Sequence, residues 1–260
     1  GVLGTINAAI NVPAGSAALI VSNETVAPLY LQALKDSLRS TQVDTLILPD
    51  GEQFKTLEYW SQIIDKLVDI RASRDITLLT LGGGVIGDMG GFAAASYMRG
   101  VRFIQVPTSL LAQVDASVGG KTGFNHPQGK NLVGAFHQPA SVLIDIDTLK
   151  TLPEREFSAG MAEVVKIAAI RDADFLNWLE NNSENINARE PEALISMIRR
   201  SIVNKADVVA ADERETGVRT LLNFGHSFAH ALETLTGYKQ YLHGEAVAIG
   251  MMVAVRLSEQ

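Results

Sequence analysis

Residues 76–88 read ITLLTLGGGVIGD, and this stretch determines the fold class. Residues 76–81 form a short apolar run, which is typical of a buried parallel strand. The run continues directly into three consecutive glycines at residues 82–84, and a segment rich in small residues follows at 90–95. A strand, a glycine turn and a helix start in this order are the repeating unit of an α/β domain.

The sequence on both sides of this stretch shows the same alternation of strand and helix patterns. Further buried strands are expected at residues 16–21, 45–48, 103–106 and 142–146. Amphipathic helices are expected at residues 27–38 and 57–70. The pattern predicts a Rossmann-like α/β domain with a parallel sheet, spanning residues 1–152.

The pattern changes after residue 152, where strand patterns end and helical periodicity takes over. Helices are expected at residues 154–170, 172–181, 191–212, 222–236 and 244–258. We therefore predict an all-α second domain over residues 153–260. The chain ends at Gln260 within an expected helix and without a capping glycine, so we expect this domain to be incomplete at its C-terminus.

The composition limits the class of protein. The 260 residues carry a net charge of −7, which disfavours a nucleic-acid binder because such proteins present a basic face. Cysteine is absent, so any metal must be bound by His, Asp or Glu. No apolar run is long enough to span a membrane and the N-terminus lacks a secretory signal, so we expect a cytoplasmic protein without membrane or nucleic-acid partners.

Two loops that follow expected strands could bind a nucleotide. The glycines at 82–84 would let a pyrophosphate approach the backbone at a helix N-terminus, although a tight packing turn would give the same pattern. The spacing is not G-x-G-x-x-G, so an ordinary Rossmann dehydrogenase is not the best match. Residues 50–55 (DGEQFK) would place Glu52 and Lys55 at the same crevice; the alternative is a plain turn with solvated charges.

Basic residues in glycine-rich segments indicate an anion site. Residues 115–123 and 129–131 contain Lys121 and Lys130 but lack P-loop spacing. Further basic residues are Arg99, Lys205, Arg214 and Arg219. Each one alone is best interpreted as a surface charge. As a set within an acidic protein, they favour binding of an anionic substrate.

Three segments of the second half could together bind a metal ion. Glu163 and Lys166 are three residues apart on a largely apolar helix, so they share one face. His226 and His230 have the i, i+4 spacing at which two imidazoles can bind one metal, and His243 follows 17 residues after His226. One carboxylate and two imidazoles suit a zinc-like ion and leave a coordination position open for a substrate oxygen.

These motifs, in this order, resemble the 3-dehydroquinate synthase family over nearly the whole chain. The matching segments are residues 22–25, 50–55, 82–88, 91–95, 106–111, 115–122, 129–131, 160–166, 212–217 and 223–230. The resemblance implies an NAD-binding α/β domain, a helical metal-binding domain with the active site between them, and a homodimer. The family usually continues beyond the point where this chain ends, and Val21 replaces an acidic residue sometimes present at the adenosine ribose.

The resemblance also implies roles for individual residues. The metal ligands (Zn²⁺ or Co²⁺) would be Glu163, His226 and His243, so that His230 faces the substrate. Residues for NAD would be Asn23, Asp50, Glu52, Lys55, Gly83, Gly84, Val85, Asp88, Thr108, Ser109, Leu111, Asp115, Lys121, Lys130, Thr151 and Leu152. The substrate phosphate would be held by Arg99, Lys121, Asn131, Asn223 and His230, with Arg99 reaching across the dimer. Its carboxylate or hydroxyls would contact Lys205 and Arg219, and the polar network would be completed by Lys166 and Glu215.

The implied reaction converts 3-deoxy-D-arabino-heptulosonate 7-phosphate (DAHP) into 3-dehydroquinate and phosphate, in the shikimate pathway of aromatic amino acid biosynthesis. Transient oxidation by NAD would be followed by β-elimination of phosphate, reduction, ring opening and an intramolecular aldol closure. Both His230 and the substrate phosphate are candidates for the general base. The alternatives are a sugar-phosphate cyclase of the inosose or valiolone type, a metal-dependent polyol dehydrogenase, and a catalytically inactive binding protein. Residues 125–131 together with Arg219 favour a substrate that bears a carboxylate.

Overall fold

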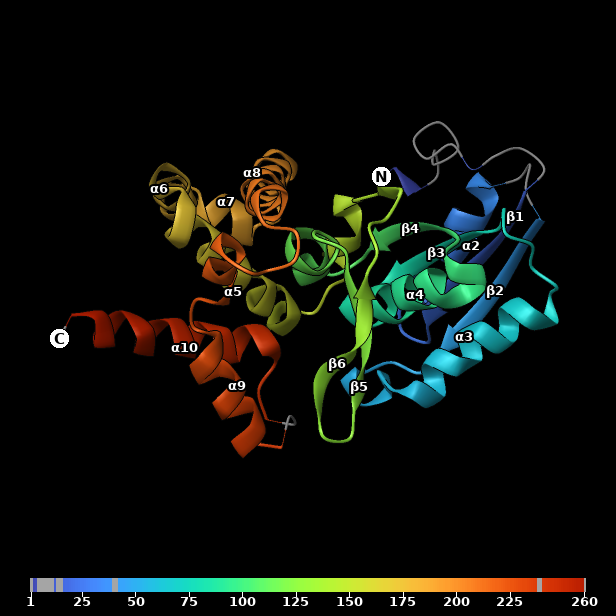
Figure 1. Cartoon of the computed structure of the whole chain (residues 1–260). Coiled ribbons are helices and arrows are strands. Elements are labelled where there is room, and N and C mark those ends of the chain that lie inside the picture. The colour runs from blue at the N-terminus through green and yellow to red at the C-terminus, as the bar shows by residue number, and fades with distance from the viewer. Residues whose placement is uncertain (1, 4–11, 13–15, 39–41, 238–239, 260) are drawn as a thin grey trace. The chain divides into compact units, whose positions relative to one another are not determined.

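The computed structural model describes residues 2–3, 12, 16–38, 42–237 and 240–259, and its contacts divide the chain into two compact units (Figure 1). The first unit contains residues 1–108 and 120–147. The second contains residues 109–119 and 148–260. The sequence predicted a single boundary at residue 152, which would place residues 109–119 in the first domain. By its contacts, this segment instead belongs to the second unit.

A five-stranded parallel sheet forms the centre of the first unit, with strand order β2-β1-β3-β4-β7. The strands are β1 (Ala17–Asn23), β2 (Gln42–Leu48), β3 (Thr77–Gly82), β4 (Arg102–Pro107) and β7 (Ser141–Val142). The predicted fold class is therefore confirmed for this unit. The last strand is shorter than expected, since only two of its residues pair with β4.

Helices cover both faces of this sheet. Leu19 and Val21 of β1 share a core with helix α3 (Leu57–Asp69) and helix α4 (Gly84–Ser96). Ala18 and Ile20 point to the opposite face and share a core with helix α2 (Ala27–Ser37). Successive residues of a strand point to opposite faces, so a continuously apolar strand needs a helical layer on each side.

The strand order reverses at β1, because β2 lies on one side of it and β3 on the other. In open α/β sheets, ligands bind at such a point, outside the carboxyl ends of the strands. These ends are Asn23 of β1 and Gly82 of β3, and α4 begins two residues after Gly82. The carboxyl ends of β1 and β3 therefore define the candidate nucleotide crevice of this unit.

The first unit also contains an antiparallel hairpin that the sequence did not predict. It consists of β5 (Lys121–His126) and β6 (Gly129–Phe136). Gly91 of α4 makes room for it, because a Cβ at Gly91 would lie 2.5 Å from Cγ2 of Thr122. The hairpin carries Lys121, Lys130 and Asn131, which the sequence placed in glycine-rich segments of an expected anion site.

Among its described residues, the second unit consists of helices joined by turns and contains no β-strand. Its helices are α5 (Glu154–Arg171), α6 (Ala173–Asn181), α7 (Ser183–Asn187), α8 (Pro191–Ala211), α9 (His226–Leu235) and α10 (His243–Ser258). Short helical turns lie at η4 (Ala112–Ala116) and η6 (Val218–Asn223), and η5 (Ile146–Lys150) leads into the unit. In the part of the chain that the structure describes, no helix is both long and apolar enough to cross a membrane.

The helix expected at residues 222–236 is interrupted, and this interruption shapes the metal-site region. Gly225 has a left-handed backbone with φ of 79°, which glycine adopts without steric cost, and α9 begins at the next residue. A side chain at Gly250 of α10 would collide with the Gly225 carbonyl oxygen, so α9 and α10 approach each other closely here. The break places His226 in the first turn of α9.

Candidate metal and substrate site

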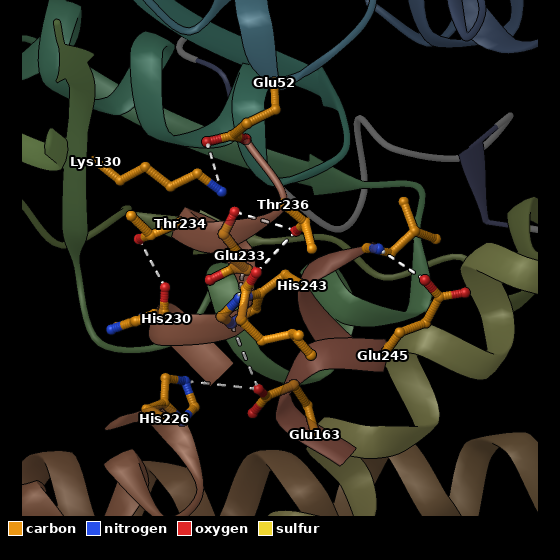
Figure 2. Close-up of polar contacts among 12 residues, drawn as sticks. Glu52, Lys130, Glu163, His226, His230, Glu233, Thr234, Thr236, His243 and Glu245 are labelled. Atoms are coloured by element: carbon orange, nitrogen blue, oxygen red, sulfur yellow. Dashed lines mark hydrogen bonds and ion pairs between the residues drawn. The ribbon is translucent and has the colours of Figure 1, made fainter. Parts of the chain in front are cut away.

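Glu163, His226 and His243 come together in the second unit, as Figure 2 shows. One ligand atom from each residue lies within 4.8 Å of the other two. Nε2 of His226 lies 3.9 Å from Oε1 of Glu163, and Nε2 of His243 lies 3.8 Å from the same oxygen. The three residues are supplied by α5, α9 and α10, with each histidine at the first position of its helix.

The donor set fits a divalent cation. The Glu163 side chain is 1% exposed, and among the described residues its Oε1 accepts no hydrogen bond. A buried carboxylate oxygen without a partner is costly unless a cation completes its surroundings. Burial, followed by the nearby charge of Asp115, raises the pKa of Glu163, while Lys166 opposes this shift. A divalent cation at Oε1 would favour the ionised carboxylate.

Both histidines present the same ring nitrogen to Glu163. Nδ1 of His226 lies 3.3 Å from the Phe224 carbonyl oxygen, and Nδ1 of His243 lies 3.3 Å from Oε1 of Glu233. A carbonyl or carboxylate oxygen can only accept, so Nδ1 carries the proton in each ring and Nε2 offers a lone pair. Burial and Lys166 lower the pKa of His226 to about 4, which keeps its imidazole neutral at physiological pH.

Glu233 is a site residue that the sequence reasoning missed. Its side chain is 2% exposed on α9, and glutamate is rarely buried without a partner. Burial lowers the pKa of His243, but the hydrogen bond to Glu233 and the charge of Glu163 outweigh it, so the pKa is raised. The available signal was spacing, because Glu233 follows His226 by seven residues and therefore lies on the same helix face.

His230 lies beside this cluster without belonging to it. Its ring centroid is 5.5 Å from that of His226 and 6.3 Å from that of His243. The residue is exposed, and Figure 2 draws its ring apart from the Glu163 carboxylate. His230 therefore borders the cluster but is not one of its three residues.

Two contacts hold α10 and its first residue, His243, in place. Glu245 accepts a hydrogen bond from the Leu242 backbone N–H at 2.8 Å, which caps the helix start. Arg155 of α5 donates to both Glu245 carboxylate oxygens, at 2.7 and 2.8 Å. A side chain at Gly244 would collide with the Ala159 carbonyl oxygen, so glycine permits the close approach of α10 to α5.

A largely buried ion pair lies in the same unit. Nζ of Lys205 donates to the backbone oxygen of Asp115 at 2.6 Å and to its Oδ1 at 2.5 Å, across 90 residues of sequence. Burial raises the pKa of Asp115, but the charges of Lys205 and Lys166 outweigh this effect and hold it well below its usual range. Burial lowers the pKa of Lys205 despite the attraction of Asp115.

The other predicted substrate residues of this unit each have a polar contact within it. Arg219 is 1% exposed and donates to the Gly119 carbonyl oxygen at 3.1 Å. Asn223 donates to Oε1 of Glu215 at 2.8 Å, and Glu215 has a left-handed backbone. Lys166 forms an ion pair with Oε2 of Glu163.

The nucleotide candidates of the first unit gather at the carboxyl ends of the strands. Asn23 donates to Oδ1 of Asp50 at 2.7 Å. Lys55 is 4% exposed and donates to Asp88 of α4 at 2.5 Å and to Oδ1 of Asn131 at 2.6 Å. Burial lowers the pKa of Lys55, but Asp88 and Glu52 outweigh it and raise the pKa. A charged lysine at this end of the sheet suits an anionic ligand.

The structure divides the predicted site residues between the two units. The first unit contains Asn23, Asp50, Glu52, Lys55, Gly83, Gly84, Val85, Asp88, Arg99, Thr108, Lys121, Lys130 and Asn131. The second contains Ser109, Leu111, Asp115, Thr151, Leu152, Glu163, Lys166, Lys205, Glu215, Arg219, Asn223, His226, His230 and His243. Within each unit, the polar contacts described above bring many of these residues together.

A parallel-sheet unit with a reversal of strand order at β1 and a helical unit with a carboxylate–imidazole cluster are together typical of a metal-dependent, nucleotide-using enzyme class. Residues 45–159 match the family model for the N-terminal part of 3-dehydroquinate synthase, and residues 160–260 match the model for its C-terminal part. The chain belongs to the 3-dehydroquinate synthase family.

Individual relatives agree with this assignment. The 3-dehydroquinate synthase of Nitrosococcus oceani is 60% identical over 246 residues, which cover 95% of this chain and 68% of that protein. This chain thus spans about two thirds of the length of such relatives.

Solved structures of two related cyclases show the same fold. A 2-deoxy-scyllo-inosose synthase complexed with carbaglucose-6-phosphate, NAD⁺ and Co²⁺ has a TM-score of 0.92 and 30% identity, covering 99% of this chain and 72% of its own. The 2-epi-5-epi-valiolone synthase of Streptomyces hygroscopicus, with NAD⁺ and Zn²⁺ bound, has a TM-score of 0.85 and 32% identity, covering 92% of this chain and 68% of its own.

Proposed function

We propose that this chain has the activity of its family and converts DAHP into 3-dehydroquinate and phosphate, as a carbon–oxygen lyase that uses NAD and Zn²⁺ or Co²⁺. The observation that carries the proposal is the cluster of Glu163, His226 and His243, with both Nε2 atoms within 4 Å of one buried carboxylate oxygen. A cation bound there would polarise a substrate oxygen as a Lewis acid, and NAD would provide a reversible hydride acceptor.

The residues around the cluster are suited to hold a polyanionic sugar acid. An ammonium group has three donors, and Lys205 uses two of them on Asp115, which leaves one for a substrate oxygen. The Asp115 contacts fix the position of this Nζ before substrate arrives, so little ordering is needed on binding. His230 and Asn223 are exposed near the start of α9 and can donate to a phosphate.

Proton transfer in the reaction is assigned to His230 or to the substrate phosphate. His230 has an exposed imidazole beside the metal cluster, and histidine is the side chain best suited to exchange a proton near neutral pH. His226 and His243 are excluded as bases in this proposal, because their Nε2 lone pairs would be occupied by the cation.

The relative degrees of identity support this activity over the alternatives. The 3-dehydroquinate synthases of Nitrosococcus oceani and Psychrobacter cryohalolentis are 60% identical to this chain, whereas the two solved cyclases that form other rings are 30–32% identical. A glycerol dehydrogenase of Schizosaccharomyces pombe is 18% identical with a TM-score of 0.72, and this likeness concerns the fold alone.

A homodimer and a cytoplasmic location are further parts of the proposal. Arg99 is exposed and has a left-handed backbone with φ of 66°, directly after Met98 in the same conformation. This turn presents the Arg99 side chain outward, as contact with the substrate of a partner protomer would require. Sedimentation velocity at micromolar concentration should give the mass of a dimer, and a monomer would contradict this part.

The activity is tested by phosphate release from DAHP in the presence of NAD and Zn²⁺, with and without a chelator. Because the relatives are longer, the assay should include the chain alone and the chain joined to the remaining third of the Nitrosococcus oceani relative. We expect release that the chelator abolishes, without net accumulation of NADH. Phosphate release from glucose 6-phosphate but not from DAHP would refute the proposal, and so would NADH production from a polyol.

A further inference from the structure

Asn125 connects two loops of the first unit through three hydrogen bonds. Its backbone N–H donates to the Lys55 carbonyl oxygen at 2.8 Å. Its Nδ2 donates to Oε1 of Glu52 at 2.8 Å, and its Oδ1 accepts from the backbone N–H of Asn131 at 2.9 Å. A single half-buried side chain thus joins the loop that follows β2 to the β5–β6 hairpin.

The orientation of the Asn125 amide follows from its two partners. The Glu52 carboxylate can only accept a hydrogen bond, so the NH₂ group must face it. The Asn131 backbone N–H can only donate, so the amide oxygen must face this group. Asn131 has a left-handed backbone with φ of 55°, and the bond to Asn125 helps to hold it in this unfavourable conformation.

The two residues held by Asn125 contact the lysines of the candidate nucleotide site. Oε1 of Glu52 lies 4.0 Å from Nζ of Lys130, a contact that Figure 2 marks. Oδ1 of Asn131 accepts from Lys55, which also pairs with Asp88 of α4. Without Asn125, the Glu52 carboxylate would be free to turn toward Lys130 and solvent, and Asn131 would lose its restraint.

We propose that Asn125 is a positioning residue for the nucleotide part of the site. It holds the Glu52 carboxylate and the Asn131 side chain in one arrangement, so that the loop after β2 and the hairpin bind NAD as one preformed surface. The inference rests on the proposed function, because it takes NAD as the ligand of this crevice. Preformed polar groups need no ordering on binding, and the affinity for the ligand rises accordingly.

The side-chain role can be separated from a role in hairpin folding. The backbone bond from Asn125 to Lys55 is available to any residue other than proline, so a substitution affects only the two side-chain bonds. Asn125→Asp keeps the size of the side chain and the acceptor for Asn131, but it places a carboxylate against Glu52. Asn125→Leu removes both side-chain bonds at similar volume.

We expect Asn125→Asp to weaken NAD binding about tenfold, as measured by titration calorimetry at neutral pH, because one hydrogen bond is replaced by like-charge repulsion. Asn125→Leu should weaken it at least as much. Asn177→Asp makes the same chemical change at an exposed position of α6 and serves as the matched control. It should leave NAD affinity unchanged, and thermal denaturation should show that all variants are folded.

A double variant gives a readout that general loosening of the hairpin would not produce. In Asn125→Asp/Glu52→Gln the donor and acceptor are exchanged, so the new amide at position 52 can donate to the new carboxylate at position 125. We expect this variant to bind NAD at least about threefold more tightly than Asn125→Asp alone, since one hydrogen bond is restored. Glu52→Gln alone completes the thermodynamic cycle.

The outcomes separate this inference from the proposed function. Wild-type binding of NAD together with unchanged affinity in folded Asn125→Asp and Asn125→Leu would overturn the role of Asn125 and leave the proposed function standing. A thermodynamic cycle that shows no coupling between positions 125 and 52 in NAD binding would also overturn it. Failure of the wild-type chain itself to bind NAD would instead overturn the proposed function, and this inference with it.

Discussion

Oε1 of Glu233 lies 3.3 Å from Nδ1 of His243, on the side of the ring away from Nε2, which lies 3.8 Å from Oε1 of Glu163. The imidazole is therefore held between two buried carboxylates, one of which fixes its tautomer. A carboxylate behind a ligating histidine orients the ring and raises its basicity toward a metal.

Glu233→Ala should therefore lower the affinity for Zn²⁺ about 10- to 100-fold, because His243 loses the group that fixes its ring. Glu233→Gln keeps an acceptor for Nδ1 and should recover most of this loss. Competition with a chromophoric chelator measures both values. Glu180→Gln, at an exposed position of α6, is the control. Equal Zn²⁺ affinity in folded Glu233→Ala and in the wild type would argue against the orienting role.

Single substitutions can distinguish the predicted metal ligands from the neighbouring His230. Glu163→Ala and His243→Ala should each abolish metal retention after gel filtration, while NAD binding stays largely intact, since the nucleotide candidates lie mainly in the other unit. His230→Ala should retain the metal, because His230 lies outside the cluster, and should lose activity. Mass spectrometry measures the metal content of each variant. Loss of metal in His230→Ala would instead indicate that His226 and His230 bind the metal together.

The parallel sheet and the long helices could be predicted because their residues are buried in regular patterns. The run at residues 76–81 is mostly apolar and every residue of β3 is buried, because this strand is covered on both faces. The β5–β6 hairpin gave no such signal. Gly123 and Gly134 lie opposite each other in it, and a side chain at either position would collide with the backbone of the other strand. Its glycines therefore serve close strand pairing, which a single sequence does not distinguish from a phosphate loop.

Contacts between residues that are far apart in the sequence could not be predicted either. Residues 109–119 belong to the helical unit because Asp115 pairs with Lys205 and the segment packs under Gly160 of α5. Nothing in the local pattern indicates either contact. Residue type and spacing could nominate a cluster that contains Glu163, His226 and His243, but the i, i+4 spacing alone favoured His226 and His230, and the ligand set came from the family resemblance. Glu233 is marked only by its spacing from His226, and it otherwise resembles a solvent-facing glutamate of an amphipathic helix.

The pair of Lys205 and Asp115 leads to a prediction about stability. Lys205→Met should lower the free energy of unfolding by about 2–4 kcal/mol, because it leaves the Asp115 carboxylate in a mostly buried position without its cation. The double variant Lys205→Met/Asp115→Asn should be less destabilised than the sum of the single variants, since the uncompensated charge is gone. Urea denaturation of the four proteins measures the coupling, and strictly additive effects would contradict it.

The depressed pKa of His226 predicts a pH dependence of the metal-free protein. Its pKa in the folded state is about 4, below the ordinary value of 6.5 that holds in the unfolded chain, mainly because of burial and secondly because of Lys166. Between these pH values the unfolded state binds more protons than the folded state, so stability falls as the pH is lowered from 6.5 to 4. The contribution of this one group is about 3 kcal/mol over the whole interval.

Comparison with His226→Gln isolates this contribution from the other titrating groups, including Glu163 and His243, whose raised pKa values act in the opposite direction. Both proteins should be unfolded with urea in the presence of a chelator at several pH values from about 4 to 7. We expect the wild type to lose more stability than the variant as the pH falls, because only the wild type carries an imidazole that protonates on unfolding. If the free energies of unfolding of the two proteins changed in parallel over this pH range, His226 would not be held neutral by its surroundings.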